Sequence, residues 1–175
     1  MKMSDGVEWA IHCCTMLAFV DADQAMPAAK LAEYHGVPPA YLAKHLQALV
    51  RAGVCESVPG PKGGFRLARS AAEITLLDVT LAVDGDETAF RCTEIRQRGP
   101  ASQPASCYPT ACGIASTMWR AEEAWRRELR AVTVADVAAS LAESVHPDQL
   151  VESAVWLQQT LENRGTRRDS SREME

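Results

Sequence analysis

The stretch GVEWAIHCC, residues 6–14, concentrates side chains that bind metals or change oxidation state. Glu8 and His12 are four residues apart, so on a helix they lie on one face and offer lone pairs to the same metal ion. By itself, such a pair is more often a surface hydrogen bond than half of a metal site. Cys13 and Cys14 follow directly, and small thiols of this kind more often pack in a core than bind metals.

A second group of candidate ligands lies in residues 86–113, a stretch without helical or strand periodicity. Cys92, Cys107 and Cys112 have the spacing C-x14-C-x4-C there, among three prolines and two glycines. A loop of this length inside a compact chain is usually functional or disordered. Three thiols within 21 residues favour metal or iron–sulfur ligation, whereas zinc sites usually have tighter C-x2-C pairs. The alternative is that the cysteines are small surface residues or include one structural thiol.

No stretch of the sequence is apolar enough, over sufficient length, to cross a membrane. The apolar run near the N-terminus is interrupted by Glu8 and His12, ends at Asp21 and follows Asp5, which is unlike a signal peptide. We therefore expect a cytoplasmic protein with no membrane partner. In that reducing compartment the six cysteines favour metal binding or redox sensing over structural disulfides.

Size and charge narrow the function classes. The chain has 175 residues, 47% of them hydrophobic, which suits one globular domain or a small domain with an extension. The net charge is −5, but residues 27–69 carry six basic and two acidic side chains, a net +4 that leaves −9 for the rest. A basic segment in an acidic chain indicates phosphate contact. No set of nucleophile, base and orienting group is evident, so we do not expect an enzyme.

The elements that must position these residues start with a helix that Ser4 or Asp5 can cap. The predicted order is a helix over 4–20, a helix over 28–34 that Pro27 initiates, a break at HGVPP (35–39), a helix over 39–52, and a strand, turn and strand over 54–69. This order is typical of a winged helix-turn-helix domain. The predicted fold class is therefore mainly α with a small β-hairpin wing.

The helix over 39–52 is the candidate DNA-reading helix, because the second helix of this motif lies in the major groove with its N-terminal half at the base edges. Basic residues of the hairpin would meet phosphates, and its glycines would let the backbone approach closely. The candidate DNA-contacting residues are Pro39, Ala40, Tyr41, Lys44 and His45 on the helix and Lys62, Gly63, Gly64 and Arg66 on the hairpin. Helix-turn-helix geometry also occurs in domains that bind no DNA, but the basic segment and the wing together favour double-stranded operator DNA as the partner.

The C-terminal half contains further helices. A helix over 75–84 begins with Thr75 and Asp78 at the spacing of a capping box. A long helix over 114–131 has more apolar surface than a lone winged domain needs, which indicates dimerisation. The expected organisation is a DNA-binding domain over 1–85, a cluster-binding loop over 86–113, dimerisation and C-terminal helices over 114–164, and a disordered tail over 165–175.

Together, these motifs resemble the family of winged-helix regulators that includes the iron–sulfur regulator IscR and the nitric-oxide sensor NsrR. The resemblance rests on LAEYHGVPPAYLAKHLQALVRAGV (31–54), GPKGGFRLAR (60–69), ITLLDVTLAVDG (74–85) and a cysteine loop before a long helix, and it covers about residues 1–135. It implies a homodimer in which the long helices pack together. It also implies that each cysteine loop lies near the first helix of the partner subunit.

The chain departs from the three closely spaced cysteines of most family members, because Cys92 stands apart from the other two. The combination of VEWAIHCC with FRCTEIRQRGP is most similar to the redox-sensing RsrR type within the family. That resemblance implies a 2Fe–2S cluster shared across the dimer. Its ligands would be Cys107 and Cys112 of one subunit with Glu8 and His12 of the other, and Cys92 is the alternative to either cysteine.

The implied ligand set suggests how such a protein would sense its signal. Replacing a thiolate by an imidazole removes one negative charge and raises the reduction potential. Trp9 lies beside Glu8 on the core side of the same predicted helix. We expect it to repack when the oxidation state changes and so to tilt the reading helix; the alternative is a core anchor. Rival functions are a same-fold sensor of nitric oxide or cluster availability, and a thiol-redox or electron-transfer protein without DNA binding.

Overall fold

The structure, a computed structural model, describes residues 3–162 of the chain. The elements are α1 (Asp5–Leu17), α2 (Ala28–His35), α3 (Pro39–Arg51), β1 (Cys55–Val58), β2 (Gly64–Leu67), α4 (Leu76–Asp84), α5 (Gly113–Ala131), α6 (Val134–Ser144) and α7 (Pro147–Glu162). Three single-turn 3₁₀ helices, η1 (Ala71–Glu73), η2 (Ile95–Gln97) and η3 (Ala105–Cys107), lie in the connections. The predicted class, mainly α with a two-stranded wing, is confirmed.

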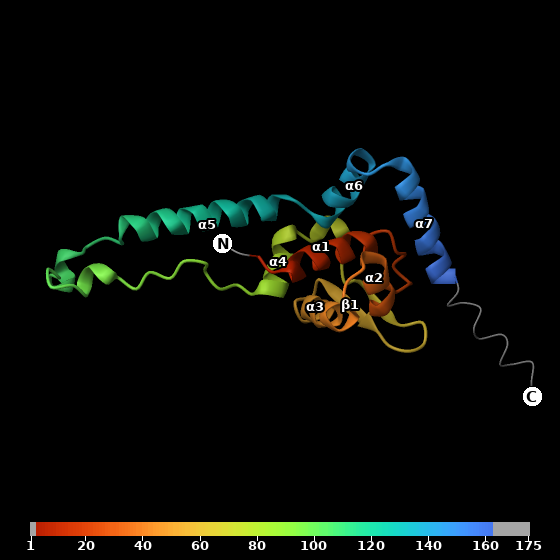
Figure 1. Cartoon of the computed structure of the whole chain (residues 1–175), viewed down its shortest axis with the longest axis horizontal. Helices are drawn as coiled ribbons and strands as arrows, with labels where there is room; N and C mark the ends of the chain where they lie inside the picture. Colours follow the sequence, from red (N-terminus) through yellow and green to blue (C-terminus); the bar gives the residue numbers. More distant parts are fainter. Residues whose placement is uncertain (1–2, 163–175) are drawn as a thin grey trace, which may run out of the picture.

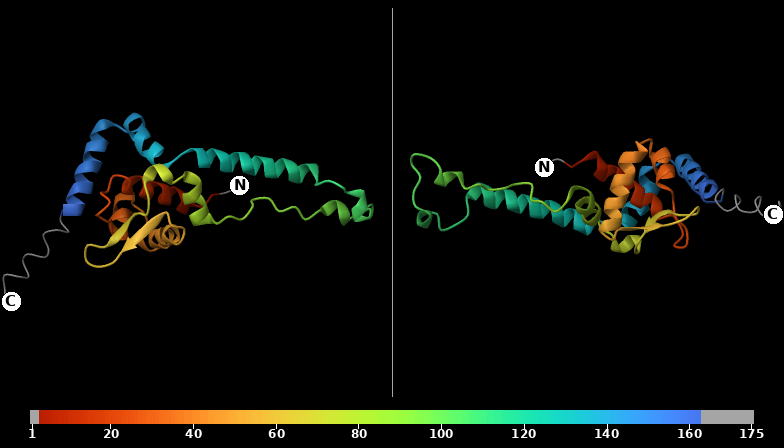
Figure 2. Two further views of the ribbon diagram at one scale, coloured as in Figure 1. Left: turned by 180° about the vertical axis from the view of Figure 1, so that it is seen from behind. Right: turned by 90° about the horizontal axis from the view of Figure 1, so that it is seen from below.

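The molecule consists of a body and an arm (Figure 1). Helices α1 to α4 pack together with the hairpin as the body, while α5 and the loop that follows α4 run away from it side by side. Two further views show the same projection, so the arm stands clear of the body (Figure 2). The cysteine loop is therefore carried on the arm and α1 lies in the body.

The core of the body forms where the first three helices meet. Leu42, Leu46 and Leu49 follow helical spacing on α3 and are fully buried. They belong to the same apolar cluster as Cys13 and Leu17 on the buried face of α1. Because burial of each large aliphatic side chain stabilises a fold by about 1.5–3 kcal/mol, this cluster holds α3 against α1. The opposite face of α3 is left to solvent.

Helix α1 begins in a way that the sequence did not predict. Ser4 occupies the N-cap position, but its side chain does not cap the helix. Instead the Ser4 backbone N–H donates to Asp84 Oδ2 at 3.0 Å, and the Ser4 hydroxyl donates to Asp84 Oδ1. The start of α1 is thereby tied to the end of α4. The helix also ends at Leu17 rather than at residue 20.

The wing is a short antiparallel hairpin anchored to the segment before α2. Its register pairs Glu56 with Arg66 and Ser57 with Phe65. Phe65 is buried, and its backbone N–H and carbonyl exchange hydrogen bonds of 2.8 Å with Met26. This two-way bond fixes the wing beside the helix-turn-helix.

The arm is anchored at the point where the chain returns from it. Thr75 and Asp78 form the predicted capping box at the start of α4. Beside it, the Leu76 N–H donates to the Val132 carbonyl at 2.9 Å, and the Val134 N–H donates to the Ile74 carbonyl at 2.8 Å. The C-terminal end of α5 is therefore held on the body, while its N-terminal end is the far end of the arm.

Helix α7 covers α2 on the side of the body away from the arm (Figure 1). The rings of Tyr34 and Trp156 lie 4.8 Å apart between centroids, and the Tyr34 hydroxyl donates to Ser153 Oγ at 2.6 Å. Within residues 3–162, no helix combines the length and apolarity needed to cross a membrane. The tail predicted over 165–175 lies outside the described residues.

Candidate functional site

Glu8 and His12 share the exposed face of α1, as the four-residue spacing predicted. Trp9, which follows Glu8 in the sequence, is half-buried and packs against the apolar core. The body therefore presents a carboxylate and an imidazole to solvent, with the half-buried indole of Trp9 on the same helix. Such a pair supplies two metal ligands, which is fewer than any closed metal site requires.

Cys13 and Cys14 lie on the buried face of α1 and are fully buried. Burial, followed by the neighbouring Cys55 thiol, raises the pKa of Cys13 to about 12. A hydrogen bond with Cys55, together with burial, also raises the pKa of Cys14. Because the thiolate is the form that binds metals and attacks electrophiles, these thiols pack rather than react, as the sequence predicted.

The remaining cysteines lie on the arm. Cys92 and Cys107 are exposed, and Cys112 is half-buried just before α5. Cys107 ends the single turn η3 and Cys112 is the N-cap residue of α5. The pair thus brackets a short turn at the far end of the arm, while Cys92 lies earlier in the loop.

A clasp between Arg96 and Tyr108 orders this turn. The guanidinium of Arg96 lies over the Tyr108 ring, 4.9 Å from the centroid, and the Tyr108 hydroxyl donates to the Arg96 carbonyl at 3.0 Å. Arg96 also donates to the carbonyl of Thr110 at 3.3 Å. Hydrogen bonds and charge from Glu94 raise the pKa of Arg96, and the reciprocal bond lowers the pKa of Glu94. The nearby Cys112 thiol adds to the effect on Arg96, so a fixed positive charge lies close to this candidate ligand.

The two candidate ligand pairs are not brought together within one chain. Across residues 3–162, no group of three His, Cys, Asp or Glu side chains is placed so that it could hold a metal ion. The carboxylate and imidazole lie on the body and the thiol pair lies at the end of the arm (Figure 1).

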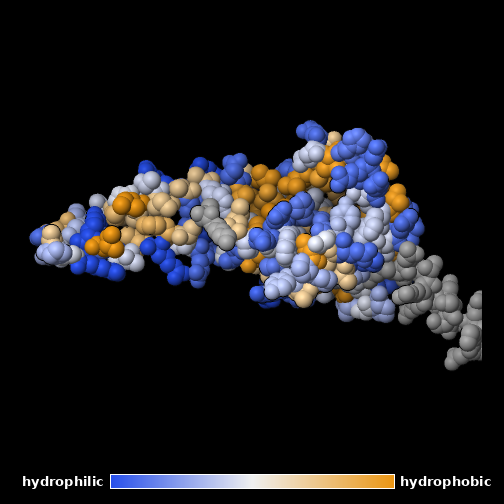
Figure 3. Space-filling model, viewed as in Figure 1, coloured by the Kyte–Doolittle hydropathy of each residue, from blue (hydrophilic) through white to orange (hydrophobic). Residues whose placement is uncertain are grey.

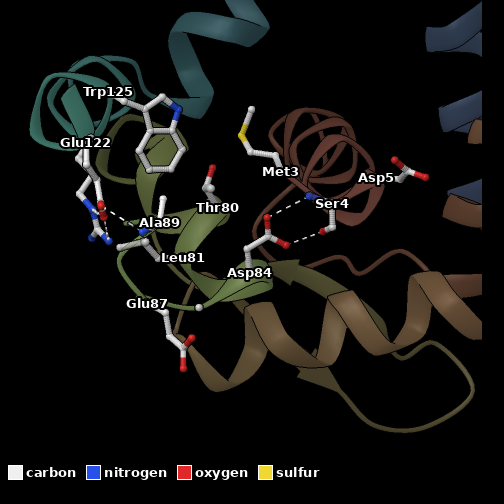
Figure 4. Close-up of a pocket in the computed structure, with 12 residues that line it drawn as sticks. Met3, Ser4, Asp5, Thr80, Leu81, Asp84, Glu87, Ala89, Glu122 and Trp125 are labelled. Atoms are coloured by element: carbon white, nitrogen blue, oxygen red, sulfur yellow. Dashed lines mark hydrogen bonds and ion pairs between the residues drawn. The ribbon is translucent and has the colours of Figure 1, made fainter. Parts of the chain in front are cut away.

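A hollow of about 560 Å³ lies at the base of the arm, between the start of α1, the end of α4 and α5. Figure 4 shows Trp125 and Met3 facing it, with Ser4 bonded to Asp84 on one side. On the other side the buried Glu122 carboxylate accepts from the Ala89 N–H at 3.1 Å and from Arg126 at 3.0 Å. The hydrogen bond from Ala89 to Glu122, together with an ion pair between Arg126 and Asp86, connects α5 to the loop that runs beside it and so fixes the arm where it leaves the body.

The outer face of α3 carries most of the predicted DNA-contacting side chains. Pro39, Ala40, Tyr41 and Lys44 are all exposed, and Tyr41 retains 64% of its surface. No part of the described chain covers this face, so Tyr41 and Lys44 are accessible to a partner. His45 differs, since it is half-buried and turned toward α1.

The four predicted DNA-contacting residues of the wing differ in exposure and in their contacts within the chain. Lys62 is exposed at the turn. Arg66 is half-buried and donates to its cross-strand partner Glu56 and to the Ala22 carbonyl. The two glycines serve the wing itself: a Cβ on Gly63 would lie 2.0 Å from the Val58 carbonyl oxygen, and one on Gly64 would lie 2.4 Å from that of Met26. Their small size is required by the turn and by the anchor to the segment before α2.

A row of rings that the sequence did not predict leads from α7 to the ligand pair. The Tyr34 and His35 rings lie 5.0 Å apart and the His35 and His12 rings 5.6 Å apart, between centroids. Burial, and then the neighbouring His12, lowers the pKa of His35 to about 4. In the described part of the chain, His35 Nε2 is buried without a hydrogen-bond partner. The signal available in the sequence was only the adjacency of Tyr34 and His35.

Comparisons with known proteins place this architecture in a family. Residues 3–140 match the Rrf2 family, described as "Iron-dependent Transcriptional regulator". The chain is 32% identical over 138 residues to YffB of Lactococcus lactis, named as an HTH-type transcriptional regulator, covering 79% of this chain and 87% of that protein. It is 30% identical over 92 residues to the HTH-type transcriptional regulator IscR of Photorhabdus laumondii, covering 53% of this chain and 56% of that protein. The chain spans 58% of the length of another relative, YwgB of Bacillus subtilis.

Solved structures share the fold. CymR, the global cysteine regulator of B. subtilis, superposes with a TM-score of 0.60 at 21% identity, covering 79% of this chain and 97% of that one. T. potens IscR superposes with a TM-score of 0.61 at 20% identity, covering 83% and 92%. At these identities the likeness concerns the fold alone. The family match over most of the chain and the winged helix-turn-helix make this chain a DNA-binding transcriptional regulator of the Rrf2 family.

Proposed function

We propose that the protein is a homodimeric, operator-binding regulator that senses redox state through a 2Fe–2S cluster held between its two subunits. The ligands would be Cys107 and Cys112 of one subunit together with Glu8 and His12 of the partner subunit. Cys92 is the alternative thiol. The observation that carries the proposal is the separation of two incomplete ligand pairs, each exposed or partly exposed, on two parts of one chain.

The donor chemistry fits such a group. Two thiols bracket a short turn, and the pair on α1 supplies an exposed imidazole and an exposed carboxylate. Two of each make four ligands, the number that a 2Fe–2S cluster takes from protein side chains. The guanidinium of Arg96 lies close to Cys112, so a cation adjoins one of the two candidate thiol ligands.

A cluster in this site would supply a reversible one-electron couple, with a potential raised by the imidazole ligand relative to an all-cysteine site. Glu8 is a hard, anionic ligand, so its bond to iron should weaken most when negative charge is added. Trp9 lies between this face of α1 and the core, and its packing would respond to movement of Glu8. Because α3 packs on α1, the change in Trp9 packing would then alter the position of α3 and of its outer, DNA-reading face.

The dimer is supported by the apolar surface of the arm. Ile114, Met118 and Trp119 on α5 retain 67%, 43% and 43% of their surface. Figure 3 shows apolar residues on the arm as well as at its junction with the body. A helix that extends this far from a body with exposed apolar side chains is typical of a subunit interface.

A mixed dimer, assembled from two different variant subunits, would test the ligand assignment. One subunit carries Glu8→Ala and His12→Ala, and the other carries Cys107→Ala and Cys112→Ala. Each homodimer should lack visible iron–sulfur absorption after anaerobic reconstitution. The mixed dimer should recover about half the absorbance of the wild type, because one of its two sites still has all four ligands. A colourless mixed dimer, or a wild-type protein that binds zinc instead of iron, would contradict the proposal.

Operator binding in the two oxidation states separates redox sensing from its rivals. The probe is a duplex selected by the wild-type protein from a random-sequence library, at fixed salt because phosphate contacts make affinity salt-dependent. A redox sensor should cycle between two affinities without losing iron. A sensor of nitric oxide or of cluster availability would change affinity only when the iron is lost or modified.

A further inference from the structure

We propose that His45 is the positioning residue that transmits movement of Trp9 to the DNA-reading helix α3. The inference rests on the proposed function, because it assigns the receiving end of the switch. It also differs from the sequence-based expectation, in which His45 was a candidate DNA contact.

Gly6 makes room for the His45 ring in the first turn of α1. A Cβ on Gly6 would lie 2.3 Å from Cε1, 2.6 Å from Nε2 and 2.8 Å from Nδ1 of His45. All three distances are too short for any real side chain, so the imidazole rests directly on the α1 backbone. Glycine in the first turn of a helix lowers helix stability relative to alanine, and here it permits this close approach.

Trp9 meets the same imidazole from the next turn of α1. The ring centroids are 6.0 Å apart and the ring planes are inclined by 78°, an edge-to-face arrangement. Aromatic pairs in this geometry attract one another beyond the area that they bury. His45 is therefore held between the Gly6 backbone and the Trp9 indole.

The position of His45 on α3 allows this contact to move the helix. Its neighbours are Lys44, which is exposed on the outer face, and Leu46, which is fully buried. His45 lies on the boundary between these two faces and faces α1. A change in the Trp9 rotamer therefore pushes or releases α3 at the level of Tyr41 and Lys44, the residues placed for base and phosphate contact.

A double-mutant cycle on operator affinity tests the link. The variants are Trp9→Ala, His45→Ala and the double variant, measured as the full homodimer in a single oxidation state on the selected duplex. Coupled residues give non-additive effects, and we expect the two substitutions to deviate from additivity by about threefold or more in Kd. His45→Phe keeps a ring against Gly6 and Trp9 and should retain most of the coupling, which a general loss of stability would not do.

Gln47→Ala is the matched control, because Gln47 is exposed on α3 and has no described contact with α1. Its effect on affinity should add to that of Trp9→Ala. Additivity of the His45 and Trp9 substitutions, to within the error of the Gln47 control, would overturn the proposal.

Gly6→Ala gives a second test, which changes the α1 side of the contact and leaves the His45 side chain in place. The added methyl must displace the His45 ring, so operator affinity should change in the wild-type background. In the His45→Ala background the methyl meets open space, and the same substitution should have little effect. Equal effects in both backgrounds would overturn the proposal.

The two proposals fail separately. A wild-type protein whose affinity is independent of oxidation state would refute redox sensing, while non-additivity between Trp9 and His45 would still establish the link. A redox-dependent wild type with additive variants would keep the sensor and remove His45 from its mechanism.

Discussion

At the scale of single residues, the cysteines divide into reactive and unreactive thiols. Burial raises the pKa of Cys13 to about 12, and a hydrogen bond with Cys55 helps to raise that of Cys14. A raised pKa keeps the thiol protonated at neutral and mildly alkaline pH, so neither side chain should react with iodoacetamide in the folded, metal-free protein. Cys92 and Cys107 are exposed and should be alkylated rapidly.

Peptide mass spectrometry after a short alkylation checks this, and the same reaction in denaturant, where all six cysteines should react, is its control. Alkylation of Cys14 at the rate of Cys107 in the folded protein would show that the core of α1 opens to solvent.

Arg96 provides a second residue-scale prediction. Its guanidinium covers the Tyr108 ring and bonds the Thr110 carbonyl, so it orders the turn that carries the thiol pair. Arg96→Ala should therefore accelerate loss of visible iron–sulfur absorption under air, while DNA binding by the metal-free protein stays unchanged. Arg98→Ala, an exposed neighbour with the same loss of charge, is the control. Equal acceleration by both variants would mean that charge alone, not the clasp, protects the site.

What could be predicted from the sequence at this scale depended on distance along the chain. The Thr75–Asp78 capping box and the Glu8–His12 face follow from spacings of three and four residues, and both were predictable. The bond between Ser4 and Asp84 spans 80 residues and was not predictable, because it depends on how two helices pack.

At the scale of elements, the basic residues of α3 and the wing differ in whether they are free to contact DNA. Lys44 and Lys62 are exposed, whereas Arg66 is engaged by Glu56 and the Ala22 carbonyl. Each phosphate contact contributes to the dependence of affinity on salt. Lys44→Ala and Lys62→Ala should each weaken operator binding and lower the slope of log affinity against log salt by about 1.

Arg66→Ala should change that slope less, because the guanidinium is already neutralised by its strand partner. Titrations at several salt concentrations measure all three slopes. A larger loss for Arg66→Ala than for Lys62→Ala would show that DNA displaces Glu56.

At this scale the order of the elements was predictable from the sequence, whereas the orientation of single side chains was not. The helix-turn-helix and hairpin were recognisable from periodicity, prolines and glycines. The orientation of His45 toward α1, and the use of Gly63 and Gly64 for the chain's own contacts, depend on packing between elements. Such contacts leave no periodic trace in the sequence.

At the scale of the whole molecule, the arm raises the question of what covers it. Ile114, Met118, Trp125 and Leu129 follow one another at spacings of four, seven and four residues, so they share one face of α5. Near the body that face is partly covered, since Trp125 and Leu129 are half-buried, but Ile114 and Met118 beyond it are exposed. An apolar stripe that continues past its own body has the form of an interface with a second copy of the chain.

Met118→Glu should therefore dissociate the dimer, because it places a charge in the middle of the stripe. Sedimentation should show a dimer dissociation constant raised by at least tenfold, the equivalent of about 1.4 kcal/mol. Ala124→Glu puts the same charge at an exposed position of α5 outside the stripe and should leave the dimer intact. If the ligands are divided between subunits, Met118→Glu should also lose iron–sulfur absorption and operator binding at the protein concentration at which it becomes monomeric. A monomer that keeps its colour would mean that the arm folds back to its own α1, and that the dimer, if it forms, serves DNA binding alone.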